Sequence, residues 1–372
     1  MPVVTLKNVS ISQGDLAPGR GLNLEIRDRE FVVLAGPPSS GISTVLRMIA
    51  GLEFAPGDVL LGERRLNDIS PKDRDVAFVS KDFAPYPRMS VFDNLAFGLQ
   101  CRKFPKTETQ KRVRAVAEIM GLQGLLQREA RSVSAEELQW VALARGMVLQ
   151  PKVFLFDEPF ATLETQAQRR GRAEVKKLHQ RLPATIIYAT HDPMEAMAMG
   201  ARMVIINNGT VEQDGNAQSI YEEPANLFAA GFVGDPAMNL IQGALKQDRD
   251  SLLFSEAGDG TIELRLSNSR FAQAAPFAGQ AVVLGIRPED LEVSSSATGA
   301  GRSPTSFPAL VDEVERKGPA TDLHLQTGAH ALICRSQRKV DSSEGGYRAQ
   351  FEVNLAKAHL FDPSSGIRIT QE

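Results

Sequence analysis

One stretch decides the fold of this chain: Gly36-Pro37-Pro38-Ser39-Ser40-Gly41-Ile42-Ser43-Thr44. An apolar run at 31–35 precedes it, and a second run at 45–50 follows it and ends at Gly51. This order predicts a strand, a glycine-bounded loop and a helix, the frame of a phosphate-binding loop, G-x-x-x-x-G-K-[ST]. Such loops hold phosphate oxygens because backbone N–H groups and the positive end of the helix point to one spot. The frame is present, but Ile42 stands where the motif requires lysine.

Two further apolar segments place acidic and imidazole side chains after expected strands. The first ends in Asp157 and Glu158, and the second is followed by His191. Ahead of both lies the run Val133-Ser134-Ala135-Glu136-Glu137. Alone, a loop without lysine is weak support for phosphate binding, because Gly/Pro/Ser turns between strands and helices are common. The order and spacing of all these segments together make chance agreement an inadequate explanation.

In this order the segments resemble the ATPase subunits of ABC transporters, and the surrounding residues resemble the carbohydrate-importer branch, including the maltose and glycerol-3-phosphate importers. The resemblance covers the whole chain. It implies an α/β fold, in which a P-loop ATPase domain with a mostly parallel sheet precedes a small β-barrel-like regulatory domain. The expected boundaries are 1–235 for the nucleotide-binding domain, with a helical subdomain at about 88–150, and 236–372 for the regulatory domain.

Length and composition agree with two globular domains. The chain has 372 residues, 42% of them apolar and 23% charged, with a net charge of −3. A charge so close to zero gives no support for a nucleic-acid partner. Cys101 and Cys334 lack metal-ligand spacing, which favours isolated thiols in a reducing compartment. We expect neither a secretory signal nor a membrane span, because no apolar stretch approaches the roughly 20 residues that a spanning helix needs.

The resemblance assigns roles at an ATP site residue by residue. Ser43 and Asp157 would ligate Mg²⁺, and Glu158 would be the general base that polarises water. His191 would contact the γ-phosphate. The ATP itself would contact Gly36, Pro37, Pro38, Ser39, Ser40, Gly41, Ile42, Ser43, Thr44 and Gln13.

Several of these positions depart from the family pattern. Gln13 replaces the aromatic residue on which adenine stacks, and Glu164 replaces the aspartate of the D-loop. Lys81 replaces the Q-loop glutamine, which contacts the metal and the attacking water. This lysine either supplies part of the missing loop charge or lies on a solvated rim. Ile42 removes a charge-assisted hydrogen bond worth roughly 1.5–3 kcal/mol.

The signature segment is changed as well. The family has Leu-Ser-Gly-Gly-Gln, and this chain has Val133, Ser134, Ala135, Glu136 and Glu137. Ser134 and Glu137 have the spacing of a capping box, and carboxylates are favourable near a helix N-terminus. A helix end that is capped by its own side chains and negatively charged is a poor lid for the γ-phosphate of ATP on a partner subunit.

The changes fall at nucleotide-contacting positions while the apolar strands keep the family pattern, so we expect weak binding of ATP and Mg²⁺ and weak or absent hydrolysis. Our hypothesis is a peripheral subunit on the cytoplasmic face of the inner membrane, serving an importer for a sugar, oligosaccharide or polyol. Its partners would be a second, lysine-containing ATPase, two permease subunits and, indirectly, a solute-binding protein. Permeases alone would give it contact with the membrane, by docking on exposed apolar side chains among residues 82–100. Two alternatives remain open: a fully active homodimeric importer ATPase and a non-transport regulatory protein on the same scaffold.

Overall fold

A computed structural model describes residues 3–11, 21–82, 85–200, 202–249, 251–294, 304–337 and 345–369. Two compact units divide the chain, Met1–Ala217 and Gln218–Glu372. In this division residues 218–235 group with the second unit. Each unit contains its own cluster of buried apolar side chains.

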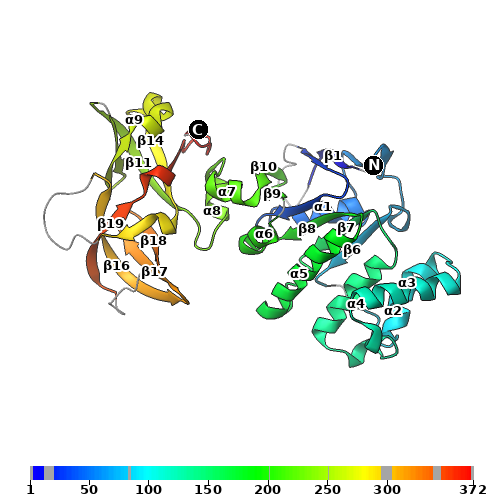
Figure 1. Ribbon diagram of the computed structural model, residues 1–372. Helices are drawn as coiled ribbons and strands as arrows, with labels where there is room; N and C mark the ends of the chain where they lie inside the picture. Colours follow the sequence, from blue (N-terminus) through cyan, green and yellow to red (C-terminus); the bar gives the residue numbers. More distant parts are fainter. Residues whose placement is uncertain are drawn as a thin grey trace. The chain divides into compact units, whose positions relative to one another are not determined.

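The sheet at the centre of the first unit follows the order β10-β9-β3-β8-β7-β6 (Figure 1). Neighbouring strands from β9 to β6 are parallel, and β10 pairs antiparallel with β9. The inner strands are almost continuously apolar, as parallel strands buried on both faces require. The strands are β3 (Phe31–Ala35), β6 (Val76–Ser80), β7 (Val153–Asp157), β8 (Thr185–Thr190), β9 (Arg202–Asn207) and β10 (Thr210–Asn216).

The rest of the first unit is an antiparallel sheet and a set of helices. The antiparallel sheet follows the order β2-β1-β4-β5, with β1 (Val4–Val9), β2 (Leu22–Ile26), β4 (Asp58–Leu61) and β5 (Arg64–Arg65). Helix α1 packs on β6, β7 and β8, and α2 packs on α3 and α4 (Figure 1). The helices are α1 (Ile42–Ala50), α2 (Val91–Cys101), α3 (Lys106–Ile119), α4 (Ala135–Met147), α5 (Thr165–Arg181) and α6 (Pro193–Met199).

Helix α1 is fixed at both of its ends. Gly41 and Gly51 flank it with positive φ values of 87° and 79°, a backbone conformation that glycine adopts without strain. The guanidinium of Arg74 is buried and donates to the carbonyl oxygens of Met48 (2.8 Å) and Ile49 (3.1 Å). A Cβ on Gly51 would lie 2.4 Å from the carbon of this guanidinium. The last turn of α1 is therefore closed by a side chain from a distant segment.

The parallel register brings several loops to one edge of the central sheet. The carboxyl ends of β3, β6, β7 and β8 lie side by side, and ligand sites of such sheets form at this edge. The loop 36–41 follows β3, Lys81 follows β6, Glu158 follows β7 and His191 follows β8. The strand, loop and helix that the sequence predicts around residue 36 are confirmed by β3 and α1.

The second unit is β-rich, as the sequence predicts. Its two antiparallel sheets follow the orders β13-β12-β11-β14-β20 and β15-β19-β16-β17-β18 (Figure 1). Apolar side chains alternate along these strands and fill a common core. The strands are β11 (Asn239–Asp248), β12 (Ser251–Glu256), β13 (Glu263–Ser267), β14 (Ala281–Ile286), β15 (Leu291–Val293), β16 (Ser306–Lys317), β17 (Ala320–Gln326), β18 (Ala331–Ser336), β19 (Tyr347–Val353) and β20 (His359–Phe361), and the helices are α7 (Ala217–Glu222), α8 (Leu227–Phe232) and α9 (Asn268–Phe271).

Candidate functional site

The loop between β3 and α1 requires its glycines for steric reasons. A Cβ on Gly36 would lie 2.1 Å from the carbonyl oxygen of Ile206. Inside the loop, the N–H of Ser40 donates to the carbonyl of Pro37 (2.8 Å), and the Ser40 carbonyl accepts from the N–H of Gly209 (3.0 Å). Strand β9 and the turn that follows it thus hold the loop in place. Helix α1 begins directly after the loop. A glycine-bounded turn at a helix N-terminus fits a phosphate group.

Ile42 supplies no charge to this turn. Its side chain is fully buried and belongs to the apolar core of the first unit. It packs in the same cluster as Val45 of α1 and Ile206 of β9. The position that carries a cation in the motif therefore contributes to stability and supplies no charge to the loop.

Ser43 and Asp157 meet where α1 begins and β7 ends. The Ser43 hydroxyl donates to Asp157 Oδ1 at 2.7 Å. Burial raises the pKa of Asp157, and the bond from Ser43 opposes that shift. A hydroxyl and a carboxylate are hard oxygen donors of the kind Mg²⁺ takes, usually together with phosphates of a nucleotide. No cluster of three or more acidic, His or Cys side chains suited to a metal occurs among the described residues. The pair fits a Mg²⁺ ion that arrives with ATP and completes its shell from phosphate and water.

Lys81 and Glu158 form an ion pair at the same edge. Lys81 Nζ lies 2.5 Å from Glu158 Oε2, and the Lys81 N–H donates to the Asp157 carbonyl at 3.0 Å. The lysine side chain is 43% exposed and the glutamate side chain is 14% exposed. The hydrogen bond to Glu158 is the largest cause of a raised Lys81 pKa. Since the resemblance makes Glu158 the general base, its carboxylate is engaged by a cation before any substrate binds.

His191 is bound to the phosphate loop itself. Its Nδ1 lies 2.7 Å from the carbonyl oxygen of Gly36. A carbonyl only accepts, so Nδ1 carries the hydrogen in this arrangement. In the neutral ring Nε2 is then an acceptor, and it donates to a phosphate oxygen only in the doubly protonated ring. The neighbouring Asp192 caps α6 by accepting from the Met194 N–H (2.8 Å).

The signature segment lies at the start of α4 and is capped by its own side chains. The Glu137 N–H donates to Ser134 Oγ (3.2 Å), and the Ser134 N–H donates to Glu137 Oε2 (2.7 Å), which confirms the predicted capping box. The hydrogen bond from the Ser134 N–H, followed by that from the Ser134 side chain, holds the pKa of the Glu137 carboxyl below its usual value. Glu136 forms an ion pair with Arg170 of α5 (3.0 Å). Ala135 begins the helix, and Val133 precedes the cap in extended conformation.

The structure thus brings together one group of predicted residues and leaves others apart. The phosphate loop, Lys81, Ser43, Asp157, Glu158 and His191 share one edge of the sheet. Among the described residues, no hydrogen bond or ion pair joins 133–137 to that loop. Glu164 is exposed at the N-terminus of α5, without a side-chain cap bond. Gln13 lies outside the described residues.

Some contacts of the site have no signal in the sequence motifs. The Gln139 side-chain amide donates to the carbonyl of Pro159, which links α4 to the loop after β7. Trp140 packs near Phe160 of the same loop, with ring centroids 6.0 Å apart. The signature helix and the segment that carries Glu158 are therefore joined within this chain.

Comparisons with known proteins agree with this architecture. Family models match at residues 20–161 (ABC transporter), 234–291 (MalK OB fold domain) and 284–361 (TOBE domain). A solved structure, cbiO1 from Clostridium perfringens, part of the ABC transporter complex cbiONQ, is similar with a TM-score of 0.53 and 24% identity, over 59% of this chain and 90% of that chain. At this identity the likeness concerns the fold alone.

Sequence relatives match over nearly the whole chain. The oligosaccharides import ATP-binding protein MsmX of Bacillus subtilis is 39% identical, and the match covers 93% of this chain and 93% of that protein. The trehalose/maltose import ATP-binding protein MalK of Thermococcus litoralis is 38% identical, over 95% of each chain. The sn-glycerol-3-phosphate import ATP-binding protein UgpC of Yersinia pseudotuberculosis is 37% identical, over 99% of each chain. This chain therefore belongs to the ATP-binding subunits of ABC transporters, in the branch whose ATPase domain is followed by a MalK-type OB fold and a TOBE domain.

Proposed function

We propose that the chain is the ATP-binding subunit of an importer for a sugar, oligosaccharide or polyol, on the cytoplasmic face of the inner membrane. Relatives named for the import of oligosaccharides, trehalose/maltose and sn-glycerol 3-phosphate support this substrate class. Two permease subunits would provide the contact with the membrane, and a solute-binding protein would deliver the substrate to them. None of the described helices is long and apolar enough to cross a bilayer.

The same proposal makes this subunit the catalytically impaired half of a heterodimeric ATPase pair. The observation that carries it is the ion pair between Lys81 and Glu158. A general base must accept a proton from the attacking water, so its carboxylate oxygens must be able to contact that water. One oxygen of Glu158 is instead bound by the Lys81 ammonium and is not available to water.

The apolar environment of Ile42 supports weak phosphate binding. Without a lysine, the loop offers backbone N–H groups and the end of α1, but no cation, to the β- and γ-phosphates. One charge-assisted hydrogen bond contributes roughly 1.5–3 kcal/mol. That corresponds to about 10- to 150-fold in affinity, since each 1.4 kcal/mol is tenfold. Mg²⁺ held by Ser43 and Asp157 would offset part of the loss by neutralising phosphate charge.

A titration of Mg-ATP into the purified chain tests the proposal directly. The native chain should bind with a Kd above the micromolar range. Ile42→Lys should tighten binding about tenfold if ~1.4 kcal/mol is regained. Ile42→Met is the matched control, because it changes the shape of this core position without adding a charge, and it should leave affinity unchanged.

Folding of each variant is checked by its melting curve, since residue 42 lies in the core. A micromolar Kd in the native chain would contradict weak binding. Equal affinities of folded Ile42→Lys and Ile42→Met chains would show that the missing cation is not the cause.

A further inference from the structure

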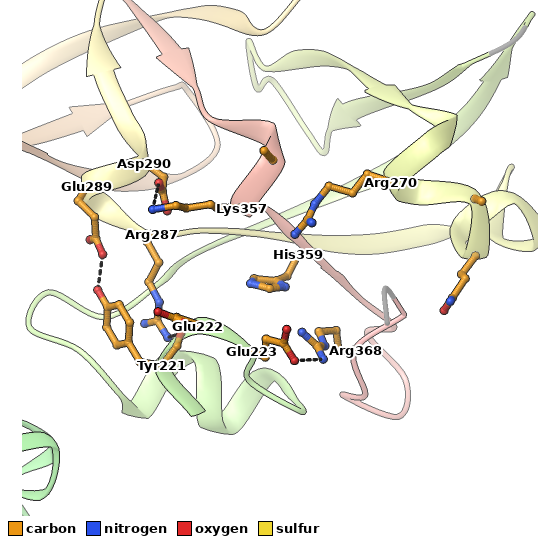
Figure 2. A pocket seen from close by; sticks show the side chains of 13 residues that line it. Tyr221, Glu222, Glu223, Arg270, Arg287, Glu289, Asp290, Lys357, His359 and Arg368 are labelled. Atoms are coloured by element: carbon orange, nitrogen blue, oxygen red, sulfur yellow. Dashed lines mark hydrogen bonds and ion pairs between the residues drawn. The ribbon is translucent and has the colours of Figure 1, made fainter. Parts of the chain in front are cut away.

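The second unit contains a polar pocket that the ATPase function does not use. Its volume is about 830 Å³, within the roughly 300–1,000 Å³ that small-molecule sites occupy. The pocket is surrounded by side chains from α7 and from the short 3₁₀ helices that precede β15 and β20 (Figure 2). The segments around residues 270 and 368 provide the rest of its lining. Its lining includes Tyr221, Glu223, Arg270, Arg287, His359 and Arg368.

The carboxylates of this pocket are already bound by donors of the same chain. Two of them form ion pairs and two accept from neutral groups, so none requires a cationic ligand. Glu222 accepts from the Gln218 amide (2.8 Å). Figure 2 shows the other three bonds, of Glu223 with Arg368 (3.5 Å), Glu289 with the Tyr221 hydroxyl (2.5 Å) and Asp290 with Lys357 (3.5 Å).

Two of the arginines have a different environment. Arg287 is only 4% exposed, stacks on the Tyr221 ring at 3.9 Å and donates to the carbonyl oxygens of Tyr221 (2.6 Å) and Val233 (2.5 Å). Arg270 donates to the Ala358 carbonyl at 3.3 Å. Within the described residues neither guanidinium forms an ion pair, and the Nε of each is buried without a hydrogen-bond partner. Burial lowers the Arg287 pKa, and the nearby charges of Glu289 and Asp290 only partly oppose this shift.

A buried histidine completes this side of the pocket. His359 is 4% exposed, and its Nδ1 has no hydrogen-bond partner. Figure 2 shows the side chains of Arg270 and Arg368 directed towards the space beside its ring. Burial, followed by the charges of Arg368 and Arg270, lowers the His359 pKa to about 4, so the ring is neutral at pH 7. Arg270, Arg287 and His359 thus line the same pocket, and each has one buried nitrogen without a hydrogen-bond partner.

We propose that this pocket binds a small metabolite with an oxyanion head, namely a phosphate ester of a sugar or polyol. Guanidinium groups bind phosphate through parallel, charge-assisted hydrogen bonds, and three of them, on Arg270, Arg287 and Arg368, line this pocket. The volume exceeds what a phosphate ion alone fills, so an uncharged polar body would occupy the rest of the pocket. The proposal concerns residues of the second unit only, and it stands or falls independently of the ATP site.

Calorimetric titration of the full chain with glucose 6-phosphate, inorganic phosphate and glucose tests the site. We expect saturable binding of glucose 6-phosphate, weaker binding of inorganic phosphate and no binding of glucose. Arg270→Gln and Arg368→Gln should each weaken glucose 6-phosphate binding tenfold or more. Arg348→Gln, which alters an exposed arginine of β19, is the matched control and should have no effect.

The loop of the first unit is a second place where phosphate fits, so the pocket variants decide the location of any binding that is seen. Unchanged affinity in folded Arg270→Gln and Arg368→Gln chains, or no binding of either phosphate compound, would overturn the proposal. Inorganic phosphate binding as tightly as glucose 6-phosphate would overturn the assignment to an ester. If an arginine variant has a lowered melting temperature, the glucose 6-phosphate affinity of His359→Gln is compared with that of the native chain instead. Since Mg-ATP affinity is measured separately, failure here leaves the proposed ATPase function intact.

Discussion

At the scale of single residues, the site has lost a cation at one position and gained one at another. Ile42 is buried in the core, whereas Lys81, which follows β6, pairs with Glu158, which follows β7. An ion pair as exposed as this one contributes little to stability. Its effect on chemistry is larger, because it binds the carboxylate that would accept a proton. Two readings of Lys81 follow: it restrains Glu158, as we propose, or it moves to the phosphates when ATP binds.

The two roles of Lys81 predict opposite results for Lys81→Gln. Made in the Ile42→Lys background, which restores the loop charge, Lys81→Gln should raise kcat several-fold by freeing Glu158. Lys81→Arg keeps the ion pair and should leave kcat unchanged. Steady-state ATPase assays and Mg-ATP titrations of both variants measure the effect. Weaker ATP binding by Lys81→Gln, with no gain in kcat, would assign the ammonium to the phosphates instead.

The site residues that the sequence could predict are those whose roles depend on strand ends. Asp157, Glu158 and His191 follow apolar strands, so a parallel sheet brings them near the loop without further information. The partner of Lys81 was not predictable, because a long, flexible side chain reaches several groups and the choice depends on distances of a few ångström. For the same reason the sequence left open whether this lysine serves the nucleotide or lies on a rim.

At the scale of elements, the two capped helices of the site differ in how their caps arise. The Ser134–Glu137 box at α4 joins residues three apart, so the sequence predicts it directly. The closure of α1 by Arg74 joins segments that are distant in sequence, and no local pattern indicates it. Helix α1 carries Ser43 at its start, so this distant contact helps to hold the element on which the site is built.

Replacing Arg74 should therefore destabilise the first unit. In Arg74→Met the carbonyl oxygens of Ile49 and Ile69 lose the donor that the guanidinium provides. A buried acceptor without a donor costs roughly 1–3 kcal/mol. Each kcal/mol lowers the melting temperature of a unit of this size by about 2–4 °C. Arg64→Met, at an exposed position of β5, is the control, and equal melting temperatures for both variants would contradict the role of Arg74.

At the scale of the whole molecule, the sequence predicted the order of domains and the class of each fold. Continuous apolar runs separated by helices indicate a parallel sheet, and short alternating runs after residue 236 indicate antiparallel β structure. The sheet orders of the second unit were not predictable, because its short strands alternate alike and pair across long stretches of chain. Its pocket likewise draws residues from several separate segments, so no motif marks it.

The proposed heterodimer makes a specific prediction about which ATP site works. Each composite site in this family pairs the phosphate loop and base of one subunit with the signature segment of the other. A homodimer of this chain would place Ile42, a lysine-bound Glu158 and Glu136 in both sites. With an intact partner, one site combines the loop and Glu158 of this chain with a good signature. The other combines the partner's loop, lysine and base with Ser134-Ala135-Glu136 of this chain.

Residual turnover should occur in the second of these sites, because it keeps the loop lysine, the metal ligands and an unrestrained base. In a reconstituted complex, replacing the partner's catalytic glutamate should abolish ATPase activity, while Glu158→Gln should change it little. Glycines at Ala135 and Glu136 should raise the rate, since they remove a carboxylate from the segment that closes over the γ-phosphate. Loss of most activity in Glu158→Gln would instead place turnover at the site built on the loop of this chain, and the impairment we infer from its ion pair with Lys81 would be wrong.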